Sequence, residues 1–206
     1  MTRNWILLLP FLLPIPAAAG ALTDLLMAPH LFEAEPAGVA VAYAEERSVP
    51  EREGMTVADV TAGELRLEVV PSEEGHELRL VREVGGAAKP LGTFGVEAAN
   101  PVLLYFLETT VRVMAEATGG NPYYIRNRIR EALAAAGLGE QEGTVREVLL
   151  APFAADANRA RMGVFGDLSI RLRFDPEAPA RILELSADTP GEDGRYHEKM
   201  VLVGEK

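Results

Sequence analysis

The fold is decided by the stretch between residues 100 and 137, which reads NPVLLYFLETTVRVMAEATGGNPYYIRNRIREALAAAG. It contains the same helix-start signal twice, as the dipeptides Asn100-Pro101 and Asn121-Pro122. Asparagine is favoured at a helix N-cap because its side-chain oxygen accepts free backbone N–H groups. Proline suits the first helical position, where no N–H is needed. The repeated signal therefore predicts two consecutive helices.

Both predicted helices carry an apolar face and end at glycine. The first spans about 101–118 and ends at Gly119-Gly120, and the second spans about 122–136 and ends at Gly137. The apolar residues of the first are Leu103, Leu104, Phe106, Leu107, Val111 and Met114, and those of the second include Ile125, Ile129 and Leu133. Because two glycines separate the helices, we predict a helical hairpin over about 101–136 with the helices side by side.

Alternating apolar and polar residues flank this hairpin, which is the pattern of strands with one solvent-exposed face. Before it, the alternation covers 39–44, 65–69 and 78–80, with a hairpin loop at 71–75 and a charged, solvated connection at 45–54. A short helical turn capped by Thr23 precedes these segments. After the hairpin, the strand pattern covers 145–150, 168–174, 182–185 and 196–203. The last three segments, joined by short turns, indicate an antiparallel meander.

The order of strands, helical hairpin and strands predicts the α+β fold class. We expect an antiparallel sheet, with a curved half-barrel as one form of it, and the inserted helical hairpin packed on one face.

The first 19 residues have the order of a secretory signal peptide. Arg3 gives a positively charged start, residues 5–15 form an apolar run, and Ala17, Ala18 and Ala19 supply the small residues of a cleavage site. The run contains prolines and is too short to span a hydrocarbon core of about 30 Å, so cleavage is favoured over an uncleaved anchor. We predict a signal peptide over 1–19, with Ala21 as the alternative cleavage position, and a single α+β domain over 20–206.

The chain contains no Cys, which excludes both disulfides and a cysteine-linked lipid anchor. An exported protein without disulfides suits a bacterial periplasm better than a eukaryotic extracellular setting. No later segment has the roughly 20 apolar residues of a membrane span. We therefore expect a soluble periplasmic protein with no membrane span after signal cleavage.

Composition and motifs argue against several function classes. The chain has 20 basic and 31 acidic residues and a net charge of −11, so a nucleic-acid partner is not expected. It has no phosphate-binding loop, no dinucleotide-binding glycine motif and no nucleophile elbow. None of His30, His76 and His197 has a ligand-type neighbour two or four residues further on, so no metal and no cofactor are predicted. We assign no catalytic residue, and an enzyme is less favoured than a binding protein.

An arginine cluster on the second predicted helix is the candidate site. Arg126, Arg128 and Arg130 follow Tyr123 and Tyr124 in a chain that is otherwise acidic. Guanidinium groups and a tyrosine hydroxyl can bind a carboxylate or another anion. The alternative is structural, with the arginine stems covering the edges of the apolar stripe and the charged heads pairing with Glu and Asp.

These features favour a binding or carrier module for an apolar or anionic amphiphile, or for an envelope protein. The predicted ligand site is a cleft between the helices and the sheet. Its apolar lining would be Leu103, Phe106, Leu107 and Ile129. Two alternatives stay open: that these residues simply fill the core, and that the protein is an envelope hydrolase without a recognisable motif. Such a hydrolase needs a cleft with an acid of perturbed pKa, or a His near a Ser or an acid.

Two resemblances accompany this interpretation. The run GGNPYYIRNRIR, from Gly119 to Arg130, resembles a stretch of exported bacterial proteins of unknown function, which implies no activity. The order of elements alone resembles that of the periplasmic half-barrel carriers of lipoproteins, which implies a curved sheet covered by a helical lid.

Overall fold

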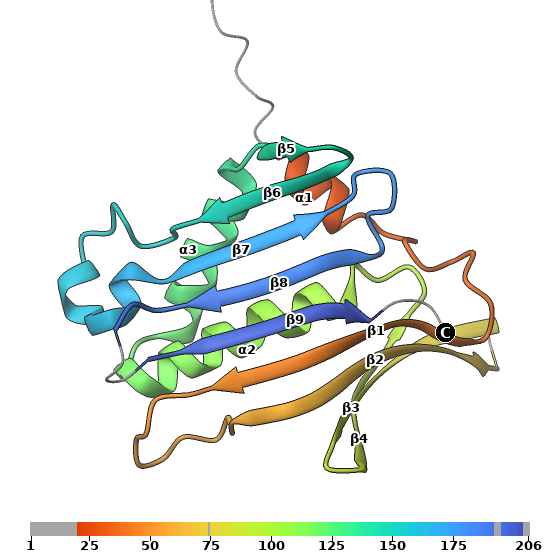
Figure 1. Ribbon diagram of the computed structural model, residues 1–206, viewed down its shortest axis with the longest axis horizontal. Coiled ribbons are helices and arrows are strands. Elements are labelled where there is room, and N and C mark those ends of the chain that lie inside the picture. Colours follow the sequence, from red (N-terminus) through yellow and green to blue (C-terminus); the bar gives the residue numbers. More distant parts are fainter. Residues whose placement is uncertain (1–19, 74, 192–194, 204–206) are drawn as a thin grey trace, which may run out of the picture.

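The computed structural model describes residues 20–73, 75–191 and 195–203, and the predicted signal peptide lies outside this part. Nine strands of the described residues form one antiparallel sheet in the order β4-β3-β2-β1-β9-β8-β7-β6-β5. The sheet is not closed, and helices pack on it (Figure 1). The predicted α+β class is confirmed.

The first and last strands of the chain meet in the middle of the sheet. Four strands precede the helical hairpin: β1 (Gly38–Ser48), β2 (Val60–Ser72), β3 (Gly75–Val84) and β4 (Ala87–Gly95). Five follow it: β5 (Glu140–Glu142), β6 (Val145–Leu150), β7 (Ser169–Phe174), β8 (Ile182–Asp188) and β9 (His197–Val203). Antiparallel pairing of β1 with β9, with Ala44 opposite Val201, joins the two halves. Strands β7, β8 and β9 are neighbours, so the predicted meander is confirmed.

The two long helices begin at the predicted caps. In α2 (Pro101–Thr118), Asn100 Oδ1 accepts the N–H groups of Val102 and Leu103 at 3.1 and 3.3 Å. In α3 (Pro122–Ala135), Asn121 Oδ1 accepts those of Tyr123 and Tyr124 at 2.9 and 3.4 Å. Gly119 ends α2 at a φ of 68°, which favours glycine. The helical hairpin lies against one face of the sheet, behind it in Figure 1.

The hydrophobic core lies between this hairpin and the sheet. Strand residues from both halves of the sheet are fully buried, including Tyr43, Leu65, Leu67, Ile170, Leu172, Phe174 and Leu185. A short helix, α1 (Ala21–Leu26), adds Leu22 and Leu26 to the same core. None of the helices in the described part of the chain is long and apolar enough to cross a membrane.

The structure differs from the sequence prediction at several places. Residues 45–48 belong to β1 and are not a solvated connection, because the alternation of the strand continues through them. Strands β4 and β5 were not predicted, since the first contains Pro90 and two glycines and the second is short and acidic. Gly20 occupies the N-cap of α1, whereas Thr23 lies inside the helix. The link over 154–163 leads into a 3-10 helix, η1 (Arg159–Asp167).

Candidate functional site

The predicted site residues separate into groups with different surroundings. Leu103 and Phe106 are fully buried and belong to the hydrophobic core beneath α2. These two side chains therefore fill the space in which the sequence analysis placed a cleft between helix and sheet. Ile129, at 1% exposed, belongs to the same core, so core filling describes Leu103, Phe106 and Ile129.

Tyr124 and Arg128 attach α3 to the loop before η1. The Tyr124 hydroxyl donates to Asp156 Oδ2 at 2.7 Å, and Arg128 Nε lies 3.0 Å from the same oxygen. Asp156 Oδ1 also accepts the backbone N–H of Asn158 at 2.7 Å. This N–H, the Tyr124 hydroxyl and the Arg128 guanidinium lower the pKa of Asp156. Arg128 also pairs with Glu131 of its own helix, so these contacts are structural.

The remaining members of the predicted site lie at a groove among the three helices. The groove has a volume of about 500 Å³, and its lining residues come from α1 with its C-cap residue Met27, from α2 and from α3. Four of the predicted residues line it: Leu107, Arg126, Ile129 and Arg130. Leu104 and Val111 extend the apolar floor along α2. Tyr123 is largely exposed, and its ring lies 5.5 Å from the Arg126 guanidinium carbon.

The charges around this groove do not cancel completely. Glu108 accepts a bidentate pair from Arg126, with Nε at 3.0 Å from Oε2 and NH2 at 2.8 Å from Oε1. Glu131, the other carboxylate of the lining, pairs with Arg128. Within the described ranges, Arg130 has neither an ion pair nor a side-chain hydrogen bond. One guanidinium at an apolar groove is thus left without an acidic partner.

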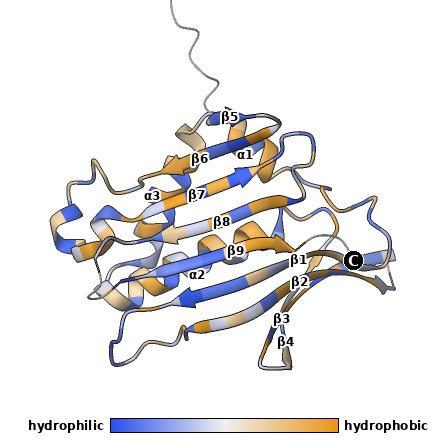
Figure 2. Ribbon diagram, viewed as in Figure 1, coloured by the Kyte–Doolittle hydropathy of each residue, from blue (hydrophilic) through white to orange (hydrophobic). Residues whose placement is uncertain are grey.

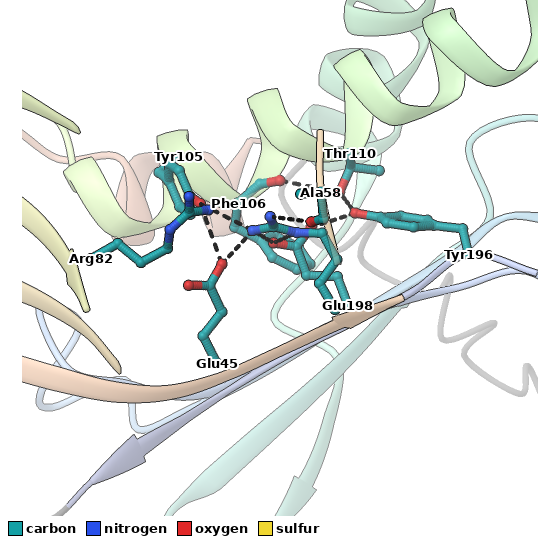
Figure 3. Close-up of polar contacts among 9 residues, drawn as sticks. Glu45, Ala58, Arg82, Tyr105, Phe106, Thr110, Tyr196 and Glu198 are labelled. Atoms are coloured by element: carbon teal, nitrogen blue, oxygen red, sulfur yellow. Dashed lines mark hydrogen bonds and ion pairs between the residues drawn. The ribbon is translucent and has the colours of Figure 1, made fainter. Parts of the chain in front are cut away.

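A second candidate site is a buried charged cluster that the sequence analysis missed. Arg47 lies between Glu45, on its own strand, and Glu198 of β9 (Figure 3). Arg47 Nε and NH2 donate to Glu198 Oε1 at 3.1 and 2.9 Å, and NH2 also donates to Glu45 Oε1. Arg47 is 3% exposed, Glu45 is 2% exposed and Glu198 is 0% exposed. Figure 2 shows the adjoining ends of β1 and β9 as a hydrophilic region of the sheet.

Hydroxyl groups connect this charged cluster to α2. The Tyr105 hydroxyl accepts from Arg47 NH2 at 3.0 Å and donates to Glu45 Oε1 at 3.2 Å. The Tyr196 hydroxyl donates to Glu198 Oε2 and lies 3.2 Å from Thr110 Oγ1. Figure 3 shows Tyr105 and Thr110 on α2, near Glu45 and Tyr196 respectively.

The cluster holds two carboxylates against one guanidinium. Burial raises the pKa of Glu198 to about 7, although the neighbouring Arg47 guanidinium acts in the opposite direction. Glu45 Oε2 is buried and has no hydrogen-bond partner within the described residues. Because the carboxylates are closed off by α2 and the sheet, the group that they can take up is a proton.

The sequence did contain a signal for this cluster. Glu45 and Arg47 continue the alternation of Val41 and Tyr43, so they point to the helix-covered face of β1. A charge-rich stretch nevertheless predicts a solvated loop, because ionised groups are rarely buried without partners. Their partner, Glu198, lies 151 positions from Arg47 in the chain.

The histidines bear on the hydrolase alternative. His197 Nδ1 lies 2.6 Å from Asp188 Oδ1, and Ser48 stands opposite His197 in the pairing of β1 with β9. A triad would require His197 Nε2 to accept the proton of Ser48, but Nε2 lies 3.4 Å from Glu46 Oε1. No group of three His, Asp or Glu residues suited to a metal ion occurs in the part of the chain that is described. We therefore do not propose hydrolysis at this position.

No protein-family model matches the chain. A search among curated proteins also gives no match.

Proposed function

We propose that this chain is an exported binding module whose helical groove holds an anionic amphiphile. A fatty acid represents this class of ligand and is the probe that we use to test the proposal. The observation that carries this proposal is the groove of about 500 Å³ among α1, α2 and α3. It has an apolar floor and, at its side, the guanidinium of Arg130, which forms no ion pair with the described residues. Pockets for small ligands have volumes of about 300–1,000 Å³ and combine an apolar lining with a few polar groups.

The two parts of such a ligand fit different parts of the groove. The acyl chain lies over Leu104 and Leu107, which are partly exposed, with the core residues Val111 and Ile129 beneath them. Burial of the chain and of the exposed part of these two leucines supplies the binding energy. The anionic head binds Arg130, whose guanidinium suits the geometry of a carboxylate. The net charge of the whole chain, −11, repels anions, so the attraction is confined to this local cation.

Export follows from the signal-peptide pattern of residues 1–19. The periplasm is the compartment that we propose, since a chain without Cys holds its fold by packing alone. Gly20, which would be the first residue after cleavage at Ala19, lies beside the groove, because its N–H donates to Ala134 O at 2.7 Å and Ala134 belongs to the groove lining.

The test is a titration of the protein with a fluorescent fatty acid. We expect saturable binding at micromolar concentration, weakened about tenfold by Arg130→Gln, which corresponds to a loss of about 1.4 kcal/mol. Added salt should weaken binding to the natural protein more than binding to the variant. Arg161→Gln is the matched control, because Arg161 is also exposed and lies outside the groove.

The competing outcomes are distinguishable. A fatty alcohol of the same chain length should bind the natural protein and Arg130→Gln equally, because it has no charge for Arg130 to bind. Absence of saturable binding, or an equal loss in the Arg130 and Arg161 variants, would overturn the proposal. Concentration-dependent dimers in sedimentation velocity that Leu107→Asp abolishes would show that a second copy of the chain occupies the groove.

A further inference from the structure

We propose that the buried cluster of Glu45, Arg47 and Glu198 is a proton-binding site that determines how firmly α2 is held on the sheet. This inference is independent of the ligand proposed for the groove, because it concerns groups that the groove does not contain. It starts from the geometry of the cluster and from its charge.

The charge of the cluster is unbalanced when both carboxylates are ionised. Arg47 donates to both Glu45 and Glu198, so one positive charge faces two negative charges in a space that water does not reach. An uncompensated buried charge costs several kcal/mol, and uptake of one proton removes it. Glu45 Oε2 is buried and has no hydrogen-bond partner among residues 20–73, 75–191 and 195–203, so the network of hydrogen bonds is incomplete at this oxygen.

The other groups around the cluster do not supply the missing positive charge. The titratable and charged groups that face it are Tyr105 from α2, Tyr196 and Glu198 beside or on β9, Glu45 and Arg47 from β1, and Arg82 from β3. Arg82 NH1 donates to the Tyr105 hydroxyl at 3.3 Å, and no ion pair joins Arg82 to either carboxylate among the described residues. Burial raises the pKa of both Tyr105 and Tyr196, so their hydroxyls stay protonated as donors near neutral pH.

The attachment of α2 depends on the same network. The Tyr105 hydroxyl of α2 donates to Glu45 directly, whereas the Thr110 hydroxyl of α2 lies 3.2 Å from the Tyr196 hydroxyl, which donates to Glu198. The Thr110 hydroxyl also donates to Phe106 O at 3.1 Å. When both carboxylates are ionised, their mutual repulsion favours states in which α2 moves aside and water reaches them. Protonation removes this repulsion and favours the packed state.

The sign of the pH dependence follows from the pKa of Glu198. This pKa is about 7 in the folded protein and near the ordinary glutamate value of 4.5 in an unfolded chain. Between these values the folded state binds more protons than the unfolded state, so this group contributes less to stability as the pH rises. The contribution is fully present below about pH 4.5 and is lost as the pH rises through about 7.

The experiment compares thermal unfolding of the natural protein with that of Glu198→Gln from pH 5 to pH 8.5. Asp156 and Glu116, whose pKa values are lowered, act in the opposite direction at acid pH, so the difference between the two proteins isolates Glu198. We expect the difference in midpoint temperature to change by roughly 5–10 °C across the range, since about 1 kcal/mol shifts a domain of this size by 2–4 °C. Glu51→Gln removes an exposed carboxylate and serves as the matched control.

Glu45→Gln gives a second variant with a different expected direction. Removal of the negative charge at Glu45 leaves Glu198 as the one carboxylate paired with Arg47, so the pKa of Glu198 should fall. The loss of stability with rising pH should therefore occur at lower pH than in the natural protein. Hydrogen exchange should report the same event in the natural protein, with faster exchange at pH 8 than at pH 6 in the segment of α2 between Tyr105 and Met114. The comparison is made after correction for the intrinsic dependence of exchange on pH, with α3 as the internal reference.

A measurement on the natural protein keeps the proposal testable if a variant does not fold. Difference infrared spectra should contain the carbonyl band of an un-ionised carboxylic acid at pH 6 that disappears by pH 8. Absence of this band at pH 6 would overturn the proposal, as would a Glu198→Gln variant with the same pH dependence as the natural protein.

Discussion

Arg47 is the residue on which the buried cluster depends, because it is the cation between Glu45 and Glu198. We predict that Arg47→Met lowers the free energy of unfolding by about 3–5 kcal/mol near pH 7, since removal of one partner leaves buried charges uncompensated. Arg171→Met, which removes a half-exposed arginine 3.7 Å from Glu147, should cost less than about 1 kcal/mol. Urea denaturation of both variants measures the difference, and equal losses would contradict this account of Arg47.

Phe106 and Leu107 are neighbours in the chain with different surroundings. Phe106 is fully buried in the core, whereas Leu107 lines the helical groove. Phe106→Ala should lower the free energy of unfolding by about 3–5 kcal/mol. Leu107→Ala should cost less, because its side chain is already partly exposed. A loss below about 1 kcal/mol for Phe106→Ala, measured by urea denaturation, would mean that this side chain is not in the core.

Among the elements, the contacts of Tyr124 and Arg128 that attach α3 to the loop before η1 can be tested by mutation. Tyr124→Phe removes a donor to the buried carboxylate of Asp156 and should lower the free energy of unfolding by about 1.5–3 kcal/mol. The folded pKa of Asp156 is lowered, so the stability that it contributes is present above its unfolded value and lost as the pH falls. The gap between the natural protein and Asp156→Asn should therefore narrow from pH 6 toward pH 3. Tyr123→Phe, at an exposed neighbour, is the control and should change neither quantity.

The elements also show which parts of the fold were predictable from the sequence. The helical hairpin was predictable, because its Asn-Pro caps and terminal glycines act on residues only a few positions away in the chain. Strands with clear alternation were predictable for the same local reason. The edge strand β4 was not, since Pro90 and Lys89 are residues that suit an unpaired edge and not a regular strand pattern.

The candidate sites were predictable only in part. Arg126, Arg130, Leu107 and Ile129 lie together because they share neighbouring helices whose faces can be derived from helical spacing. Arg128 lies on the same helix but binds Asp156, whose loop position no local pattern indicates. The cluster around Arg47 requires the pairing of the first strand with the last, so it becomes visible only in the complete sheet.

For the molecule as a whole, the contact between Gly20 and α3 favours one of the two predicted cleavage positions. Gly20 is the N-cap of α1, and its N–H donates to Ala134 O in the last turn of α3 at 2.7 Å. Cleavage after Ala19 keeps this bond and turns the N–H into a charged amine at the carbonyl end of a helix, where a positive charge is stabilising. Cleavage after Ala21 would remove both Gly20 and the first residue of α1.

If the chain is exported as proposed, we therefore predict that the mature protein begins at Gly20. Intact-mass measurement together with N-terminal sequencing of protein from the periplasmic fraction tests this directly. A chain that begins at Leu22 would show that the contact between Gly20 and α3 is dispensable for the mature fold. A chain that retains Met1 in a membrane fraction would contradict export by cleavage altogether.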